Sequence, residues 1–277
     1  MNSFLIHVYF RLGERTFICT AGEDTLIRTH ELEPSGKGLS LKFVLRGHVS
    51  SIKCMFCLPE KNGSVLMVTG GGRAQLKVWR FRILDGEISG TELADYMLRG
   101  SSKAVKRPWR KVQRETRPDP ETRFLDIETQ EGVEGETYIY VGCSDSVLRI
   151  FLYSNSSIVL YREVEFQDHC ILKLERFVVR DESFLLSCTT AGTIYVWRTG
   201  SVLSPEFDQF RIHQSGINSV DTRRDGDACL LVTGGDDNAL VLSRLQCTDG
   251  TFSHHTLWRE DKAHSAQITG VRFLGTK

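Results

Sequence analysis

The stretch TGGGRAQLKVWRF, residues 69–81, has a pattern that recurs four more times along the chain. The other copies are TAGEDTLIRTHEL (20–32), VGCSDSVLRIFLY (141–153), SCTTAGTIYVWRT (187–199) and TGGDDNALVLSRL (233–245). In each copy, apolar or β-branched residues stand three and five positions after a turn residue, which is an alternation with a period of two. The pattern predicts five strand–turn–strand hairpins, with turns at Asp24, Arg73, Asp145, Ala191 and Asp237.

A second pattern precedes some of these hairpins: a His, three residues and then an Ile that begins a further strand. It occurs in GHVSSIKCM (47–55), IHQSGINSV (212–220) and AHSAQITGV (263–271), and His169 lies in a similar place in QDHCILKL (167–174). Successive turns are 49, 72, 46 and 46 residues apart. A period near 45 residues, with a Gly-His…Trp signature, is typical of four-stranded propeller blades. The chain therefore resembles the WD-repeat proteins, although Trp79 and Trp197 are followed by Arg instead of Asp.

The predicted fold is all-β: an incomplete WD-repeat β-propeller that occupies residues 1–277 as one partial domain. We expect about four full blades, with a partial blade at each end. The first hairpin reads as the end of a blade, and AHSAQITGVRFLG (263–275) reads as the first strand of another. Since a propeller has to close to protect its strand edges, we expect this chain not to close a ring by itself.

In WD repeats, a His, a Ser or Thr, a Trp and a turn Asp form a buried polar network, because each buried polar group needs a partner. No hairpin here has the complete set: residues 69–81 carry Arg73 at the Asp position, and residues 233–245 have no Trp. We expect structural roles, instead of catalysis or metal binding, for the residues at these positions. They are His48, Thr69, Trp79, Asp145, His169, Trp197, His213, Thr233, Asp237 and His264.

The 72-residue spacing predicts an insertion between two blades at about residues 85–123. From Arg99 to Arg117 it holds eight basic residues and one acid, Glu115, whereas the whole chain has 35 basic and 35 acidic residues and no net charge. Loops of this kind tolerate insertion and often carry function. The candidate nucleic-acid-binding residues are Lys103, Lys106, Arg107, Trp109, Arg110, Lys111, Arg114 and Arg117.

The chemistry of this insertion is consistent with several functions. Val105, Trp109 and Val112 have the spacing of one helical stripe, and Pro108 favours a helix that begins near it. Basic residues neutralise phosphates and an aromatic ring stacks on bases, which suits RNA. There are two alternatives. The first is a solvated basic loop, of which a nuclear-localisation signal is one form, and the second is a docking site for an acidic protein surface.

Other features of the sequence argue against an enzyme, a metalloprotein or a membrane protein. The eight cysteines are scattered, and Cys54 and Cys57 form a lone CxxC whose side chains would point to opposite faces of a strand. A phosphate-binding loop leads into a helix. The glycine-rich run Thr69–Gly72 is instead predicted to lie between two strands. We therefore expect no catalytic residue, no bound cofactor and no metal. No segment has the length of apolar residues that a membrane span needs.

The order of five motifs resembles the C-terminal part of the WD repeat-containing protein 6 family. The motifs are LRGHVSSIKC (45–54), DPETRF (119–124) after the basic insertion, CSDSVLRIF (143–151), CILKL (170–174) and HQSGINSV (213–220). DPETR and the His-x-Ser-x-Gly-Ile-Asn-Ser run are the more distinctive of them. The resemblance spans nearly all of this chain but only part of that much longer family.

This resemblance implies a cytoplasmic, non-catalytic partner of an FtsJ-type methyltransferase. Together the two proteins would methylate the ribose 2′-hydroxyl at the wobble position of tRNA anticodons. The partner enzyme would bring S-adenosylmethionine, and this chain would help to position the tRNA through the basic insertion. The family is also associated with a protein kinase and with autophagy control. The alternative is a WD-repeat protein–protein scaffold, in kinase signalling or autophagy regulation, that does not bind RNA.

Overall fold

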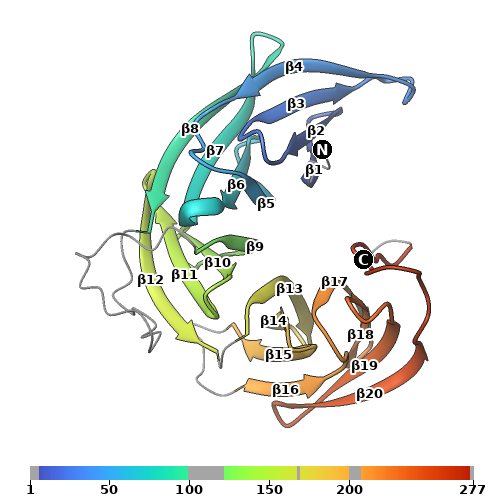
Figure 1. The fold of residues 1–277 in the computed structure, drawn as a ribbon. Helices are drawn as coiled ribbons and strands as arrows, with labels where there is room; N and C mark the ends of the chain where they lie inside the picture. Colours follow the sequence, from blue (N-terminus) through green and yellow to red (C-terminus); the bar gives the residue numbers. More distant parts are fainter. Residues whose placement is uncertain (1–5, 99–121, 167–168, 200–206, 275–277) are drawn as a thin grey trace, which may run out of the picture. The chain divides into compact units, whose positions relative to one another are not determined.

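A computed structural model of the chain describes residues 6–98, 122–166, 169–199 and 207–274. They form five four-stranded sheets, and in each sheet the strands are ordered as they occur in the sequence (Figure 1). Apart from one 3₁₀ turn, η1 (Gly72–Ala74), the described elements are all strands. The predicted all-β, WD-repeat class is therefore confirmed. The short helix predicted around Trp109 lies outside the described residues.

The sheets are numbered here in chain order. The first contains β1 (Ile6–Leu12), β2 (Arg15–Ala21), β3 (Ile27–Leu32) and β4 (Leu39–Leu45). The second contains β5 (Ile52–Pro59), β6 (Val65–Gly71), β7 (Gln75–Leu84) and β8 (Glu87–Met97). The third contains β9 (Phe124–Glu131), β10 (Thr137–Cys143), β11 (Val147–Ser154) and β12 (Ser157–Glu165). The fourth contains β13 (Ile171–Val179), β14 (Glu182–Thr189), β15 (Thr193–Arg198) and β16 (Phe207–Arg211). The fifth contains β17 (Ile217–Asp225), β18 (Ala228–Gly235), β19 (Leu240–Thr248) and β20 (Thr251–Glu260).

All five predicted hairpins are present as the two middle strands of the sheets. Their alternation places one set of side chains on each face, and the pairing register keeps these sets together. In the fourth sheet, for example, Leu186 pairs with Val196 and Cys188 with Ile194, all of them buried. The turns contain residues with positive φ, such as Asn238 at 63° and Gly192 at 74°, which let the chain reverse within a few residues.

The chain divides into two compact units, residues 1–139 with 150–162 and residues 140–149 with 163–277. The first unit has an apolar core in which Phe10, Phe17 and Phe81 meet between the first and second sheets. In the second unit, Phe184 and Phe252 meet at 4.8 Å between ring centres in a core shared by the fourth and fifth sheets. Burial of these apolar side chains is the main source of cohesion within each unit.

The structure corrects two of the predicted boundaries. The first sheet is complete, with all four strands, so the described residues hold five full sheets instead of about four. The repeat pattern missed β1 because no His-x₃-Ile signature precedes it. In addition, β8 lies inside the range 85–123 that we assigned to the insertion. Asp85 and Gly86 form a tight turn with positive φ, and β8 then pairs with β7 along its length.

The predicted last strand, in residues 263–275, is not paired as a strand in the described part of the chain. Its middle section nevertheless lies along β17. The backbone amide of Val271 donates to Ser219 Oγ at 2.9 Å, and that of Phe273 donates to Asp221 Oδ2 at 2.7 Å. The segment is therefore held against the fifth sheet, although it lacks a strand partner among the described residues.

Candidate functional site

The eight candidate tRNA-binding residues lie in residues 99–121, outside the part of the chain that the structure describes. They are Lys103, Lys106, Arg107, Trp109, Arg110, Lys111, Arg114 and Arg117. The described strands on either side are β8, which ends at Met97, and β9, which begins at Phe124. Their role as a nucleic-acid contact therefore stays a prediction.

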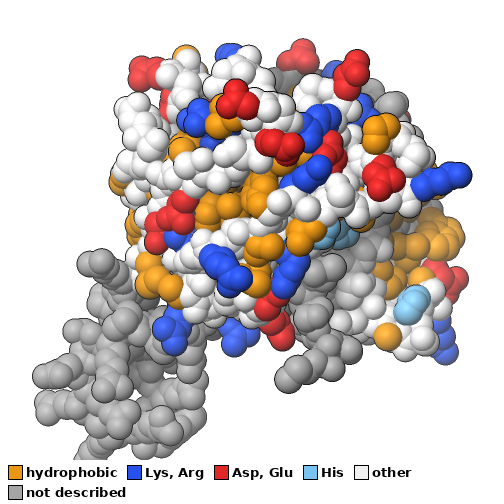
Figure 2. Space-filling view, turned by 90° about the horizontal axis from the view of Figure 1, so that it is seen from above, with side chains coloured by type: hydrophobic (Ala, Val, Ile, Leu, Met, Phe, Trp, Pro, Cys, Tyr) orange, Lys and Arg blue, Asp and Glu red, His pale blue; other side chains and the backbone are white. Residues whose placement is uncertain are grey.

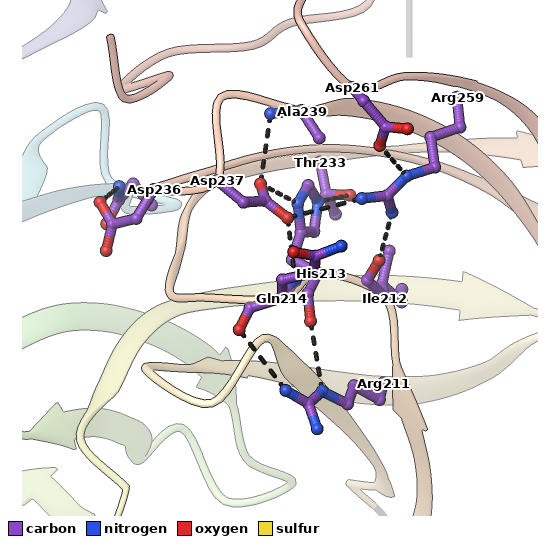
Figure 3. A network of polar contacts seen from close by, with 11 residues as sticks. Arg211, Ile212, His213, Gln214, Thr233, Asp236, Asp237, Ala239, Arg259 and Asp261 are labelled. Atoms are coloured by element: carbon purple, nitrogen blue, oxygen red, sulfur yellow. Dashed lines mark hydrogen bonds and ion pairs between the residues drawn. The ribbon is translucent and has the colours of Figure 1, made fainter.

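The best-defined polar site in the described residues is the His213 network of the fifth sheet (Figure 3). His213 precedes β17, Thr233 lies on β18, and Asp237 lies in the turn that follows. The ring of His213 joins the other two: Nδ1 is 2.8 Å from Asp237 Oδ1, and Nε2 is 2.8 Å from Thr233 Oγ1. Asp237 also accepts hydrogen bonds from the backbone amides of Gln214, at 2.9 Å, and Ala239, at 3.2 Å. The turn before β19 is thus tied to the loop before β17.

Electrostatics favour a neutral His213 beside an ionised Asp237. Burial lowers the pKa of His213, and the hydrogen bond to Asp237 offsets part of that effect. Burial acts to raise the pKa of Asp237, but hydrogen bonds from Gln214 and His213 outweigh it, and the pKa is lowered. Because a carboxylate only accepts hydrogen bonds, Nδ1 of His213 carries the proton. Nε2 is then the acceptor for the Thr233 hydroxyl.

Two arginines lie at the edge of this network (Figure 3). Arg259, on β20, donates to the carbonyl oxygen of Ile212 at 2.7 Å and forms ion pairs with Asp261 and, at 3.5 Å, with Asp237. Arg211 donates to the carbonyl oxygens of His213 and Gln214, both at 3.4 Å. These contacts hold the loop between β16 and β17 from both sides.

The order Thr–His–Asp resembles the hydroxyl, base and orienting acid of a hydrolytic triad. A triad needs a nucleophile that a substrate can reach, but Thr233 is 0% exposed and His213 is 2% exposed. A substrate carbonyl has no access to Thr233 Oγ1 in this arrangement. The contacts instead satisfy buried polar groups and hold three loop and strand segments together.

The second sheet contains a similar network, in which Gln75 takes the place of the turn Asp. His48 Nε2 is 2.7 Å from Thr69 Oγ1, and Trp79 Nε1 donates to the same oxygen at 2.8 Å. Arg73 takes no part in these contacts, but Gln75 Oε1 accepts from the amide of Val49 at 2.9 Å. Val49 follows His48 as Gln214 follows His213, so Gln75 performs the backbone contact that Asp237 performs in the fifth sheet.

Gln75 was missed by the repeat pattern because the turn before it is unusual. Arg73 and Ala74 both have positive φ, 57° and 47°, and lie in the 3₁₀ turn η1. This turn brings the residue two positions after the aligned Asp site to the loop before β5. Gln75 Nε2 then donates to Asp95 at 3.0 Å, and Lys77 forms ion pairs with Glu92 and Asp95. Burial, with the nearby charge of Lys77, lowers the pKa of His48 to about 4.

In the third sheet, the turn residue Asp145 pairs with an arginine instead of a histidine. Arg149 is 1% exposed and donates to both carboxylate oxygens of Asp145, at 2.9 and 2.7 Å, and to Glu163 at 2.8 Å. In the first sheet, Asp24 and Arg28 are also four residues apart and form an ion pair at 2.6 Å, and both side chains are more exposed than those of Asp145 and Arg149. A turn Asp followed four residues later by Arg is the sequence signal for this contact.

The remaining blade positions are placed as follows. His169 is half-buried just before β13, and His264 is exposed in the segment after β20. Trp197 is buried against Phe166 and Phe207, with ring centres 5.0 and 4.9 Å away. Its Nε1 has no hydrogen-bond partner among the described residues.

The glycine run and the CxxC pair both have packing roles. A side chain on Gly71 would place its Cβ 2.0 Å from the carbonyl oxygen of Ser51, so close backbone contact accounts for this glycine. Cys54 donates to the carbonyl oxygen of Phe124 at 3.6 Å, and burial raises the pKa of the Cys57 thiol. All eight cysteines are free, and the described residues contain no cluster of metal-binding side chains.

The described part of the chain has no helix that is long and apolar enough to cross a bilayer.

The sheets and their His–Thr networks define a protein of the WD-repeat β-propeller class. No family model matches the chain. Among curated proteins, it is similar to the "tRNA (34-2'-O)-methyltransferase regulator WDR6" of Homo sapiens, with 24% identity over 93% of this chain and 28% of the relative. The protein of the same name from Drosophila melanogaster is 24% identical over 92% of this chain and 24% of the relative. The chain thus spans about a quarter of the length of these relatives, and the resemblance to the WD repeat-containing protein 6 family is confirmed.

Proposed function

We propose that this chain belongs to a non-catalytic WD-repeat regulator of a tRNA ribose methyltransferase. The observation that carries this proposal is the similarity, over more than nine-tenths of the chain, to proteins named as regulators of tRNA (34-2'-O)-methyltransferase. A blade pattern alone is common to many WD-repeat proteins. The six curated proteins that match this chain nevertheless all carry this one name.

In the proposed complex, the chemistry belongs to a separate FtsJ-type enzyme that binds S-adenosylmethionine. This chain positions the tRNA so that the ribose 2′-hydroxyl at the wobble position reaches that enzyme. The burial of His213 and Thr233 supports a non-catalytic role, because the most triad-like group in the described residues is enclosed. Eight free cysteines are in keeping with a cytoplasmic location.

The basic stretch 99–117 is the proposed contact for the tRNA backbone. Lys and Arg side chains neutralise phosphates and release counterions, and the ring of Trp109 offers a stacking surface for a base. On the face of the described residues seen in Figure 2, basic and acidic side chains are mixed instead of gathered by sign. In the sequence, this stretch is the densest run of positive charge.

Co-purification tests the proposed complex. A tagged copy of the protein at its natural length would be isolated from cells, and its RNA would be sequenced and its protein partners identified by mass spectrometry. We expect tRNA and a ribose methyltransferase to be enriched together. A protein kinase or an autophagy factor, recovered without tRNA and without a methyltransferase, would support the scaffold function instead.

A reconstitution separates regulator from enzyme. Purified protein, incubated with tRNA and S-adenosylmethionine, should give no 2′-O-methylation. Addition of the co-purified methyltransferase should produce methylation at position 34, at a higher rate than the methyltransferase alone. Methylation by this protein without a partner would contradict the proposed division of roles.

A further inference from the structure

The fourth and fifth sheets leave a pocket of about 390 Å³ between them, beside the turn that joins β19 to β20. Its volume is within the range of pockets that hold small ligands. The outer strands β16 and β20 lie side by side there (Figure 1), and the amide of Phe252 donates to Asp208 Oδ2 at 2.8 Å. This hydrogen bond fixes one wall of the pocket, because it ties the two outer strands together.

The register of the fourth sheet directs four of the pocket residues to one face. Phe184 pairs with Arg198, and Val196 pairs with Asp208. Since residues two apart on a strand share a face, these four side chains all point toward the fifth sheet. From the fifth sheet, the ring of Phe252 meets that of Phe184 at 4.8 Å between centres. The pocket therefore has an apolar floor of Phe184, Val196 and Phe252 and a charged rim.

The turn between β19 and β20 forms the opposite side of the rim. Asp249 and Gly250 both have positive φ, 52° and 82°, which is the geometry of a two-residue Asp-Gly hairpin turn. The turn holds the exposed carboxylate of Asp249 at the pocket. A Cβ on Gly250 would lie 3.1 Å from Nη2 of Arg198, so the guanidinium of Arg198 packs closely against this glycine.

The charges around the pocket do not balance. Arg198 lies over the ring of Phe184, with Cζ 5.9 Å from the ring centre, and forms an ion pair with Glu182 at 2.9 Å. Neither Asp208 nor Asp249 has a cationic partner in the described part of the chain. With Glu182 counted, three carboxylates thus surround one guanidinium, which leaves a net charge of −2 at the rim.

We propose that this pocket binds an arginine side chain of a partner protein. The contact of Arg198 with Phe184 and Gly250 demonstrates that these walls accept a guanidinium. Arginine suits the rim because its planar group packs on rings and its five donors match carboxylates, here those of Asp208 and Asp249. The excess negative charge repels phosphates and so favours a basic protein segment over a nucleic acid. The pocket is separate from the proposed tRNA contact, and the two proposals stand or fall independently.

The probe is the blocked peptide acetyl-Gly-Arg-Gly-amide, and its neutral control carries citrulline in place of arginine. When added to the isotope-labelled 277-residue chain, the arginine peptide should shift the amide NMR signals of Gly250, Thr251 and Phe252 saturably. The citrulline peptide has nearly the same shape but no charge, so it should bind at least about tenfold more weakly. Equal binding of the two peptides, or no saturable shift with arginine, would overturn the proposal. So would an oligouridylate that shifts these signals, because it would assign the pocket to nucleic acid.

A double variant tests the two carboxylates. Asp208→Asn keeps an acceptor for the Phe252 amide, and Asp249→Asn keeps a residue that tolerates positive φ in the turn. Together they remove both charges and should weaken binding of the arginine peptide by about tenfold. The matched control is Asp85→Asn, in the Asp85-Gly86 turn of the second sheet, which should bind the peptide as the parent does. The remaining amide signals report whether each variant is folded. Undiminished binding by a folded double variant would contradict the proposed site.

Discussion

The second and fifth sheets satisfy the same buried groups with different side chains. In both, a His before the first strand contacts a Thr on the second strand, at 2.7 Å for His48 and 2.8 Å for His213. The backbone amide after the His is bound by neutral Gln75 in one sheet and by ionised Asp237 in the other. The comparison teaches that these two sheets keep an acceptor at this place, although neither its residue type nor its exact sequence position is the same.

The two networks also differ in charge. Asp237 stabilises the protonated form of His213 and offsets part of the effect of burial, whereas His48 is close to the buried cation of Lys77. The second sheet uses Trp79 as a further donor to its Thr, while the fifth sheet has Ser243 at that position, which contacts His254. The second-sheet network should therefore be the more sensitive to protonation and to removal of its central hydroxyl.

The largest expected effect is the dependence of stability on pH. The unfolded chain binds a proton at His48 near pH 6.5, but the folded chain does so only near pH 4. The contribution of this His to the free energy of unfolding is thus intact above pH 6.5 and is lost as the pH falls to about 4, by on the order of 3 kcal/mol. Urea unfolding of the whole chain across this pH range, followed by hydrogen exchange at the amides of the first unit, measures this decrease. His48→Gln should flatten the profile, and an unchanged profile would contradict the assignment.

The next effect compares the two threonines. Thr69→Val removes the partner of both His48 and Trp79 and should lower the free energy of unfolding by about 3 kcal/mol, whereas Thr233→Val removes one partner and should cost about 2 kcal/mol. Valine has nearly the same shape, so the decrease reports the hydrogen bonds. Equal decreases in the two variants, measured by denaturant unfolding, would show that the Trp79 contact adds nothing.

A smaller effect should follow an exchange of charge between the networks. Gln75→Glu places an anion near His48 and should raise its pKa by about one unit, while Asp237→Asn removes an anion and should lower the pKa of His213. Both shifts can be followed by NMR titration of the ring protons. A pKa of His48 that does not move would mean that residue 75 is not the counterpart of Asp237.

The smallest effect concerns the arginine at the edge of the fifth-sheet network. Arg259 is partly exposed, its ion pair with the buried Asp237 is long at 3.5 Å, and its nearer partner Asp261 is open to solvent, so Arg259→Ala should change the free energy of unfolding by less than about 1 kcal/mol. Thermal unfolding at low and high salt measures this change. A decrease similar to that of Thr233→Val would show that Arg259 is part of the buried network and not only its edge.

The sequence predicted the five hairpins well because alternation and turn residues are local signals. It missed β1 and β8, which form the ends of their sheets and lack a repeated motif. It also missed Gln75 and Arg149. Gln75 depends on the 3₁₀ turn with two positive φ values, which the alignment of the repeats does not contain. Arg149 follows Asp145 by four residues, a local signal that the repeat alignment did not use, and only its second partner, Glu163, comes from the next strand.

Since the polar groups of both networks are occupied in holding the sheets together, we assign the proposed recognition of tRNA to surface charge outside them. The direct test is the salt dependence of tRNA affinity for a protein with Lys106, Arg107, Arg110 and Lys111 changed to Glu. Its matched control changes Lys37, Lys61, Arg82 and Lys262 to Glu, four exposed basic residues on and beside the sheets. We predict that the first variant binds tRNA more weakly, with a salt slope reduced by about one for each phosphate that the stretch no longer neutralises, while the control largely keeps the parent slope. An unchanged slope in the first variant would contradict tRNA binding by the basic stretch.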